Sequence, residues 1–97
     1  MFARVTTYKT GPDTALDPAT EADSVRRVME IPGSRGVYFL TGGEGGKALS
    51  ITLWDTADAA AASRPAANTI REESSSAQGM QIVGVEEFEV TSNVVRD

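Results

Sequence analysis

The stretch RGVYFLTGGEGGKALSITLW, residues 35–54, decides the fold. Residues 35–41 and 47–54 are rich in β-branched and aromatic types, which favour strands. The glycine-rich segment Gly42–Gly46 between them predicts a turn, so the two strands form an antiparallel hairpin. It does not match a phosphate-binding loop, because alanine follows Lys47 and a strand follows in place of a helix.

The segments before the hairpin predict one strand and one helix. Residues 1–10 are rich in β-branched and aromatic residues, and the Gly-Pro-Asp sequence that follows ends this strand. Residues 19–30 have apolar side chains at helical spacing and charged residues between them. Pro32 and Gly33 end that helix.

The segments after the hairpin predict a second helix and a last strand. Asp55 and Thr56 provide a cap for an alanine-rich helix, which Pro65 is expected to kink or split and which fades over residues 72–76. Residues 80–91 form the last strand, and residues 92–97 are expected to be frayed or to lie at a subunit contact. The β-α-β-β-α-β order predicts one ferredoxin-like α+β domain over residues 1–97, with a four-stranded antiparallel sheet and two helices on one face.

The predicted sheet has apolar residues on both faces. In residues 47–54, leucine and isoleucine at positions 49, 51 and 53 point one way, and alanine, serine, threonine and tryptophan point the other. Residues 37–40 are apolar on both sides, and in the last strand Ile82, Phe88 and Val90 oppose Val83 and Val85. Two helices cover only one face, so we expect a second copy to cover the other and to form a two-fold homodimer. A monomer with an apolar open face is the alternative.

Composition excludes several kinds of chemistry. The 97 residues include 9 Lys and Arg, 14 Asp and Glu, no Cys and no His, for a net charge of −5. Disulfides, Cys/His zinc sites and Ser-His-Asp triads are therefore impossible. The acidic balance argues against nucleic acid as a partner. No apolar run is long enough for a membrane span and no secretory signal is evident, so we expect a cytoplasmic protein that does not bind membranes.

The acidic residues predict no metal site. Glu86, Glu87 and Glu89 lie close together in the sequence, as do Asp55 and Asp58. Successive side chains of a strand point to opposite faces, which separates Glu86 from the other two glutamates. Convergent ligands, which a hard cation needs, are not predicted, and we expect neither a metal nor a cofactor.

Three short segments resemble the antibiotic biosynthesis monooxygenase type of dimeric α+β barrel. They are the opening strand at residues 2–5, the run Ile-Pro-Gly-Ser-Arg-Gly-Val-Tyr at residues 31–38, and Ile-Thr-Leu-Trp-Asp-Thr at residues 51–56. The resemblance implies a homodimer with a cavity between sheet and helices in each subunit. Some members oxygenate polycyclic aromatic substrates without metal or flavin, and others degrade haem. This chain lacks the helix-borne His of many members, and it has Thr6 and Thr7 where haem degraders have Asn, so haem degradation is not expected.

Four residues are candidates for the ligand cavity, and each has a structural alternative. Trp54 could stack on a planar ligand at the cavity mouth, or it could be core beneath the second helix. Arg4 and Tyr8 share one strand face and could stabilise an enolate and donate a proton, respectively. Arg4 could instead pair with an acidic residue such as Glu86 or Glu89. Glu86, with its pKa raised by burial, is the remaining candidate for a base.

Two arginines of the second helix are a further possibility. Arg64 and Arg71 are seven residues apart, so on a continuous helix they could share a side and hold an anionic ligand. Pro65 is expected to disturb that geometry, and surface exposure is the alternative interpretation.

Two functions follow from these candidates. The first is a cofactor-independent monooxygenase that lets molecular oxygen react with a carbanion of an aromatic or polyketide-like substrate. The second is a non-catalytic homodimer that binds a small apolar ligand or has a structural role in an assembly. A cavity smaller than about 100 Å³ would exclude a drug-sized substrate, because pockets for such ligands occupy about 300–1,000 Å³.

Overall fold

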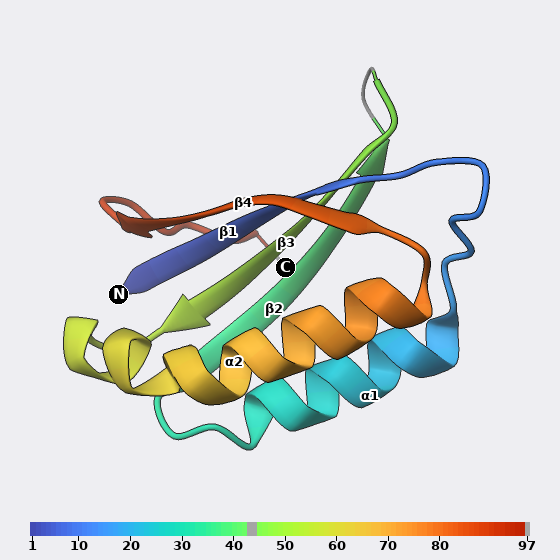
Figure 1. Ribbon diagram of the computed structural model, residues 1–97. Helices are drawn as coiled ribbons and strands as arrows, with labels where there is room; N and C mark the ends of the chain where they lie inside the picture. Colours follow the sequence, from blue (N-terminus) through green and yellow to red (C-terminus); the bar gives the residue numbers. More distant parts are fainter. Residues whose placement is uncertain (43–44, 97) are drawn as a thin grey trace.

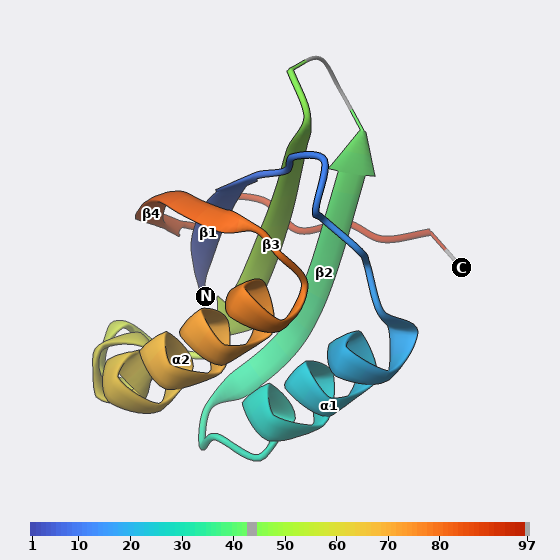
Figure 2. The ribbon, with the colours of Figure 1, turned by 45° about the vertical axis from the view of Figure 1, so that its right-hand side comes forward.

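The computed structural model describes residues 1–42 and 45–96. Its elements are β1 (Phe2–Lys9), α1 (Pro18–Met29), β2 (Ser34–Gly42), β3 (Lys47–Trp54), α2 (Ala57–Ala77) and β4 (Gln81–Glu89). The predicted ferredoxin-like fold is confirmed, with both helices on one face of an antiparallel sheet (Figures 1 and 2). The predicted hairpin joins β2 to β3, and Gly43 and Glu44 of its turn lie outside the described residues.

The strand order is β2-β3-β1-β4, so β1 pairs with both β3 and β4. A bulge interrupts the β1–β4 register, because Gly84 pairs with Thr7 and Ile82 with Tyr8. Since the bulge shifts the alternation, Ile82 lies on the helix side of the sheet and Phe88 on the open side. The expectation that these two residues share a face is therefore wrong.

The sheet is more polar toward the helices than away from them. Of the two sets of β3 residues that the alternation predicts, the one that faces the helices is Ala48, Ser50, Thr52 and Trp54. On the open face, Leu49, Ile51 and Leu53 lie beside residues of the outer strands. Tyr38, Leu40 and Phe88 there are 51%, 42% and 49% exposed. The expected apolar open face is therefore present in the structure.

Local side chains start both helices. The Asp17 carboxylate caps α1 by accepting hydrogen bonds from the Ala19 N–H at 3.3 Å and from Thr20 Oγ1 at 2.7 Å. Thr56 Oγ1 caps α2 by accepting from the Ala59 N–H at 3.0 Å. The core lies between the helices and one end of the sheet, where Val28, Trp54, Ala60 and Ile70 are buried together.

The second helix is continuous through Pro65, so the expected split is wrong. Proline lacks the N–H that would bond to the carbonyl four residues earlier. At the neighbouring carbonyl, that of Ala60, Arg4 Nη2 donates at 2.8 Å and Ser63 Oγ donates at 2.7 Å. The contact from Arg4 of β1 and the contact from Ser63 within α2 stabilise the turn that proline weakens. The helix also persists through residues 72–76, because Ser75 is buried against the rest of the fold.

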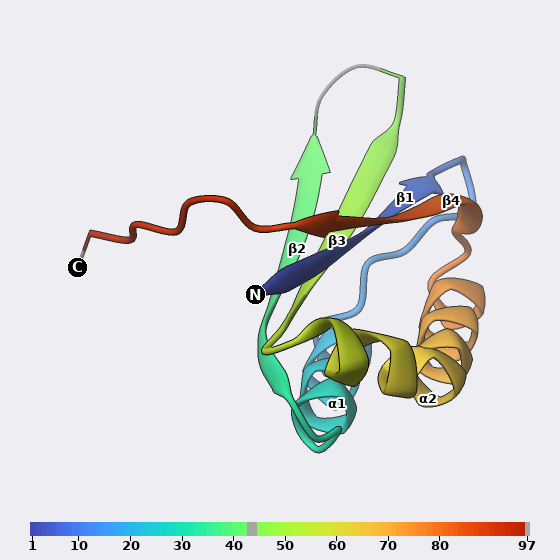
Figure 3. The ribbon, with the colours of Figure 1, turned by 90° about the vertical axis from the view of Figure 1, so that its left-hand side faces the viewer.

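The chain continues beyond β4 as an extended segment. Val90 donates a backbone hydrogen bond to the carbonyl of Met1 at 2.9 Å, and the following residues run away from the sheet (Figure 3). Val94 and Val95 are 91% and 70% exposed. Within residues 1–42 and 45–96, no helix combines the length and apolar character needed to cross a membrane.

Candidate functional site

A small, half-open pocket lies between the helix-facing side of the sheet and the two helices. Its volume is about 40 Å³. Its hydroxyl-bearing lining residues are Thr6, Tyr8, Ser24, Ser50, Thr52 and Ser74. Its apolar lining residues are Val28, Val37, Phe39, Ala67 and Ile70. Arg71 is the remaining lining residue and supplies the single charge among them.

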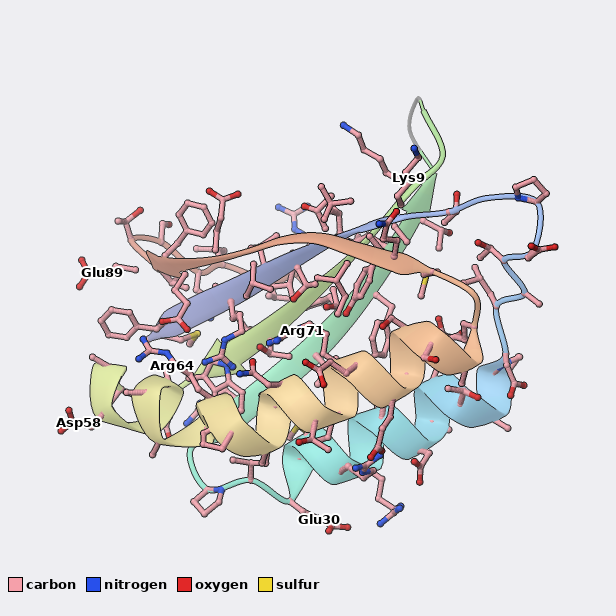
Figure 4. All side chains as sticks on the ribbon, in the orientation of Figure 1. Lys9, Glu30, Asp58, Arg64, Arg71 and Glu89 are labelled. Atoms are coloured by element: carbon pink, nitrogen blue, oxygen red, sulfur yellow. The ribbon has the colours of Figure 1, made fainter. Side chains whose placement is uncertain are left out.

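Arg71 extends from α2 toward the sheet (Figure 4). Its Nε donates to Thr6 Oγ1 at 3.1 Å and its Nη1 donates to Asn68 Oδ1 at 2.6 Å. Burial lowers the pKa of Arg71, and the nearby positive charge of Arg4 also lowers it. An arginine nevertheless stays protonated in proteins. Across the part of the chain that the structure describes, no carboxylate forms an ion pair with this guanidinium.

Tyr8 forms part of the pocket wall on β1. Its side chain is 7% exposed, and its hydroxyl lies 3.1 Å from Ser50 Oγ, with either oxygen able to donate. This contact fixes the position of the phenol beside the pocket. Of the four predicted cavity residues, Tyr8 is the one that the structure brings to this lining.

Arg4 is buried nearby, and its hydrogen bonds hold the fold together. Its Nε and Nη2 donate to Glu87 Oε2 at 3.1 and 3.0 Å, and its Nη1 donates to Ser63 Oγ at 3.2 Å. The expectation that Arg4 pairs with Glu86 or Glu89 is wrong, because the β1–β4 register places Glu87 opposite Arg4 and on the same face. Contrary to expectation, Arg4 does not line the pocket.

Trp54 is core. It is fully buried with Val28 and Ile70, and its Nε1 donates to Thr52 Oγ1 at 2.9 Å. The Arg4 guanidinium carbon lies 5.4 Å from the centroid of its ring, so the space over the indole is occupied by a protein cation. The expectation that Trp54 stacks on a ligand at the cavity mouth is therefore not met in this structure.

Glu86 lies on the wrong face to act in this pocket. It pairs with Val5, whose side chain points to the open side of the sheet, and it is exposed. The burial on which its proposed role as a base depended is absent. Glu87 faces the helices instead, but hydrogen bonds from Arg64 and Arg4 lower its pKa to about 2. A carboxylate that holds a proton so weakly is a poor general base near neutral pH.

The seven-residue spacing of Arg64 and Arg71 is the sequence feature that indicates Arg71 as a contact for an anionic ligand. Both side chains point from α2 toward the sheet (Figure 4), because the helix is continuous and seven residues make about two turns. Arg64 Nη2 donates to Glu87 Oε1 at 2.7 Å. Pro65 does not split the helix between these two arginines.

The arrangement favours binding of an anionic oxygen more than proton abstraction. A guanidinium and several hydroxyls can stabilise negative charge on oxygen. Over residues 1–42 and 45–96, no three His, Cys, Asp or Glu side chains come together as they would around a metal ion. The pocket volume is below the 100 Å³ threshold, so as it stands the pocket does not enclose a drug-sized molecule.

No family model matches this chain, and no curated protein matches it. Solved structures do match. A proposed antibiotic biosynthesis monooxygenase from Deinococcus radiodurans is 12% identical with a TM-score of 0.68, covering 100% of this chain and 99% of that one. SnoaB, a cofactor-independent oxygenase from Streptomyces nogalater, is 14% identical with a TM-score of 0.62, covering 98% and 97%.

A third similar structure contains a ligand. It is a monooxygenase from the gene ActVA-Orf6 of Streptomyces coelicolor in complex with nanaomycin D. It is 17% identical to this chain with a TM-score of 0.58, covering 99% of this chain and 92% of that one. At such identities the likeness shows the fold. The ferredoxin-like fold predicted from the sequence is thus the fold that these solved structures share with this chain.

Proposed function

We propose that this monooxygenase-like fold binds a small organic molecule carrying an anionic oxygen, and that it does so in the pocket between its sheet and helices. The observation that carries the proposal is Arg71. It supplies one cation to a pocket otherwise lined by hydroxyl and apolar groups, and among the described residues no carboxylate neutralises it by an ion pair. Arginine binds carboxylates and enolates well, because its planar fork donates two parallel hydrogen bonds.

The pocket chemistry suggests how such a ligand would lie. The oxygen would accept from Arg71, with the Tyr8 and Ser50 hydroxyls near enough to contribute. The part of the apolar body next to the head group would contact Val28 and Ile70, which line the same pocket. A volume of about 40 Å³ accommodates only the head group, so the body would leave through the open side. We therefore favour ligands with a compact anionic head on a planar apolar body.

The second candidate function is cofactor-independent oxygenation. It is favoured by the likeness to SnoaB and to the ActVA-Orf6 monooxygenase over nearly the whole chain. In such a reaction a CH₂ group and O₂ give C=O and water, and Arg71 would stabilise the enolate that reacts with oxygen. The pocket offers no carboxylate or imidazole as a base. The substrate would therefore have to ionise readily by itself, as an anthrone does.

We also propose that two copies associate through their open sheet faces. That face carries Tyr38, Leu40, Ile51, Leu53 and Phe88, with no helix over it. Exposed contiguous apolar surface favours association, and a two-fold pair would bury the same patch on both copies.

The proposed binding is tested with benzoate, a planar carboxylate, by calorimetry or NMR titration. Wild-type protein should bind benzoate, and Arg71→Gln should weaken binding by about tenfold or more, because a charge-assisted bond contributes roughly 1.5–3 kcal/mol. Arg26→Gln is the matched control, because Arg26 lies exposed on α1 and away from this pocket. Equal affinity in wild type and Arg71→Gln, or no binding by either, would overturn the proposal.

Oxygenation is tested separately by measuring oxygen uptake with anthrone. Uptake above the uncatalysed background that falls in Arg71→Gln would support catalysis. Uptake equal to background in wild type, together with benzoate binding, would leave the chain as a non-catalytic binding protein.

A further inference from the structure

A second small void lies beside the Arg71 pocket. Its volume is about 20 Å³, and it shares Tyr8, Phe39 and Ser74 with the first pocket. Beyond these shared residues, Leu16 and Met80 supply apolar surface to the second void. The two voids are neighbours, because they share these residues of β1, β2 and α2, and we call the three shared residues the partition.

Two members of the partition are held in place. Tyr8 is almost fully buried and its hydroxyl contacts Ser50 Oγ at 3.1 Å. Ser74 belongs to α2, and its Oγ accepts a hydrogen bond from Gln78 Nε2 at 3.2 Å. Moving either residue would break a polar contact in the interior, which costs free energy.

Phe39 is the movable member. It lies on β2, an edge strand, so no neighbouring strand flanks it on its outer side. Its ring has no polar atom to lose a partner, and the residue is already 38% exposed. Turning the ring outward therefore gives up only part of its apolar burial. The two voids would then be continuous past Tyr8.

We propose that Phe39 is a gate that decides how long a ligand the pocket accepts, an inference that rests on the proposed binding at Arg71. With Phe39 turned out, the two voids form one elongated pocket. Arg71 lines the first void and Glu21 lines the second. The ligand class is an elongated planar acid, with its anionic oxygen at Arg71 and an uncharged apolar end toward Leu16 and Met80, because a second acid would be repelled by Glu21.

The first part of the test asks whether the voids join, and it does not depend on Arg71. Phe39→Ala should bind benzene more tightly than wild type does, because removing the ring leaves apolar space between the two voids. Tyr38→Ala is the control, because Tyr38 is the adjacent residue and points to the opposite face. Phe39→Leu is a milder truncation and should increase benzene binding less. It replaces Phe39→Ala in the test if that variant does not fold. A folded Phe39→Ala or Phe39→Leu protein that binds no more benzene than Tyr38→Ala would overturn the gate.

The second part asks whether Phe39 selects ligand length. Benzoate and biphenyl-4-carboxylate are compared in wild type, Phe39→Ala and Tyr38→Ala. If Phe39 is turned out in less than roughly a tenth of wild-type molecules, the longer acid binds wild type about tenfold more weakly than it binds the open state. Removing the ring should therefore raise the affinity for the longer acid, relative to benzoate, by about tenfold. An unchanged ratio would overturn the selectivity role. Benzene binding by Phe39→Ala with no carboxylate binding by wild type would instead leave the joined pocket intact and refute the function proposed for Arg71.

Discussion

The guanidinium of Arg4 lies over the indole of Trp54, with its central carbon 5.4 Å from the ring centroid. Both side chains are buried, and Arg4 also donates to Glu87 and to the carbonyl of Ala60. One cation thus joins β1, β3, β4 and α2. This explains why Arg4 and Trp54, which the sequence suggested as ligand contacts, have structural roles. Arg71 lies further along α2 and is left for the pocket.

Replacing Glu87 by glutamine should destabilise the fold. Arg4 would remain charged and 2% exposed with a neutral amide in place of its carboxylate, and losing the charge-assisted hydrogen bonds costs about 1–3 kcal/mol. Denaturant unfolding at pH 7 measures the loss. Glu89→Gln is the control, because Glu89 lies on the same strand, is exposed, and forms no ion pair within the described residues. Equal unfolding midpoints for the two variants would contradict the structural role of Glu87.

The same carboxylate predicts a pH dependence of stability. The pKa of Glu87 is lowered from 4.5 to about 2, so folding favours its charged form. Its contribution is fully present above pH 4.5 and is lost as the pH falls through the folded value near 2. Wild type should therefore lose more stability than Glu87→Gln between pH 5 and pH 2. Parallel stability curves over that range would contradict the prediction.

Trp54 should report its burial directly, since it is the single tryptophan of the chain. We expect blue-shifted fluorescence that acrylamide hardly quenches in the folded protein, and a red shift on unfolding. Trp54→Phe should lower stability by about 1–3 kcal/mol, because it loses ring area and the hydrogen bond to Thr52. Ready quenching of the folded protein would instead indicate the exposed cavity-mouth position.

Gly33 should not tolerate a side chain. Its φ is +85°, and an added Cβ would lie 2.5 Å from the Cβ of Ala59 at the start of α2. Gly33→Ala should therefore lower stability by roughly 1–3 kcal/mol. Gly84→Ala is the control, because nothing lies within 4 Å of its added Cβ. Thermal unfolding that shifts equally for both variants would contradict this explanation.

The open sheet face gives a prediction about mass. Wild type should sediment at twice the 10.3 kDa chain mass at micromolar concentration, and Leu40→Lys should sediment as a single chain, since burying a lysine in an apolar interface is costly. Val25→Lys on α1 introduces the same charge on a helix and should remain paired. A wild-type mass of one chain would refute the proposed dimer.

The sequence was most informative where local patterns determine structure. The alternation in residues 47–54 predicted which residues of β3 share a face, and the threonine before α2 predicted its cap. The expected split at Pro65 is wrong, because one of the contacts that stabilise this turn comes from Arg4, 61 positions away in the chain. Local propensity contains no information about such tertiary contacts.

The site was less predictable for a related reason. Alternation alone does not fix which residue of β4 meets Arg4, because register between strands some 80 residues apart depends on the whole sheet and on a bulge. Glu86 was therefore preferred over Glu87. Arg71 was recognised as a possible ligand contact, but its place beside Thr6 requires a continuous helix, which the presence of Pro65 argued against.

The central position of β1 has a consequence for biosynthesis. Residues 2–9 leave the ribosome before β4, residues 81–89, which is one of their two sheet neighbours. During translation the edge of β1 that pairs with β4 stays unpaired until residues 81–89 are made. Exposed strand edges favour pairing with other chains. We expect the sheet to close only when β4 emerges. Slow translation of residues 57–89 would then prolong the period in which the nascent chain is prone to aggregate.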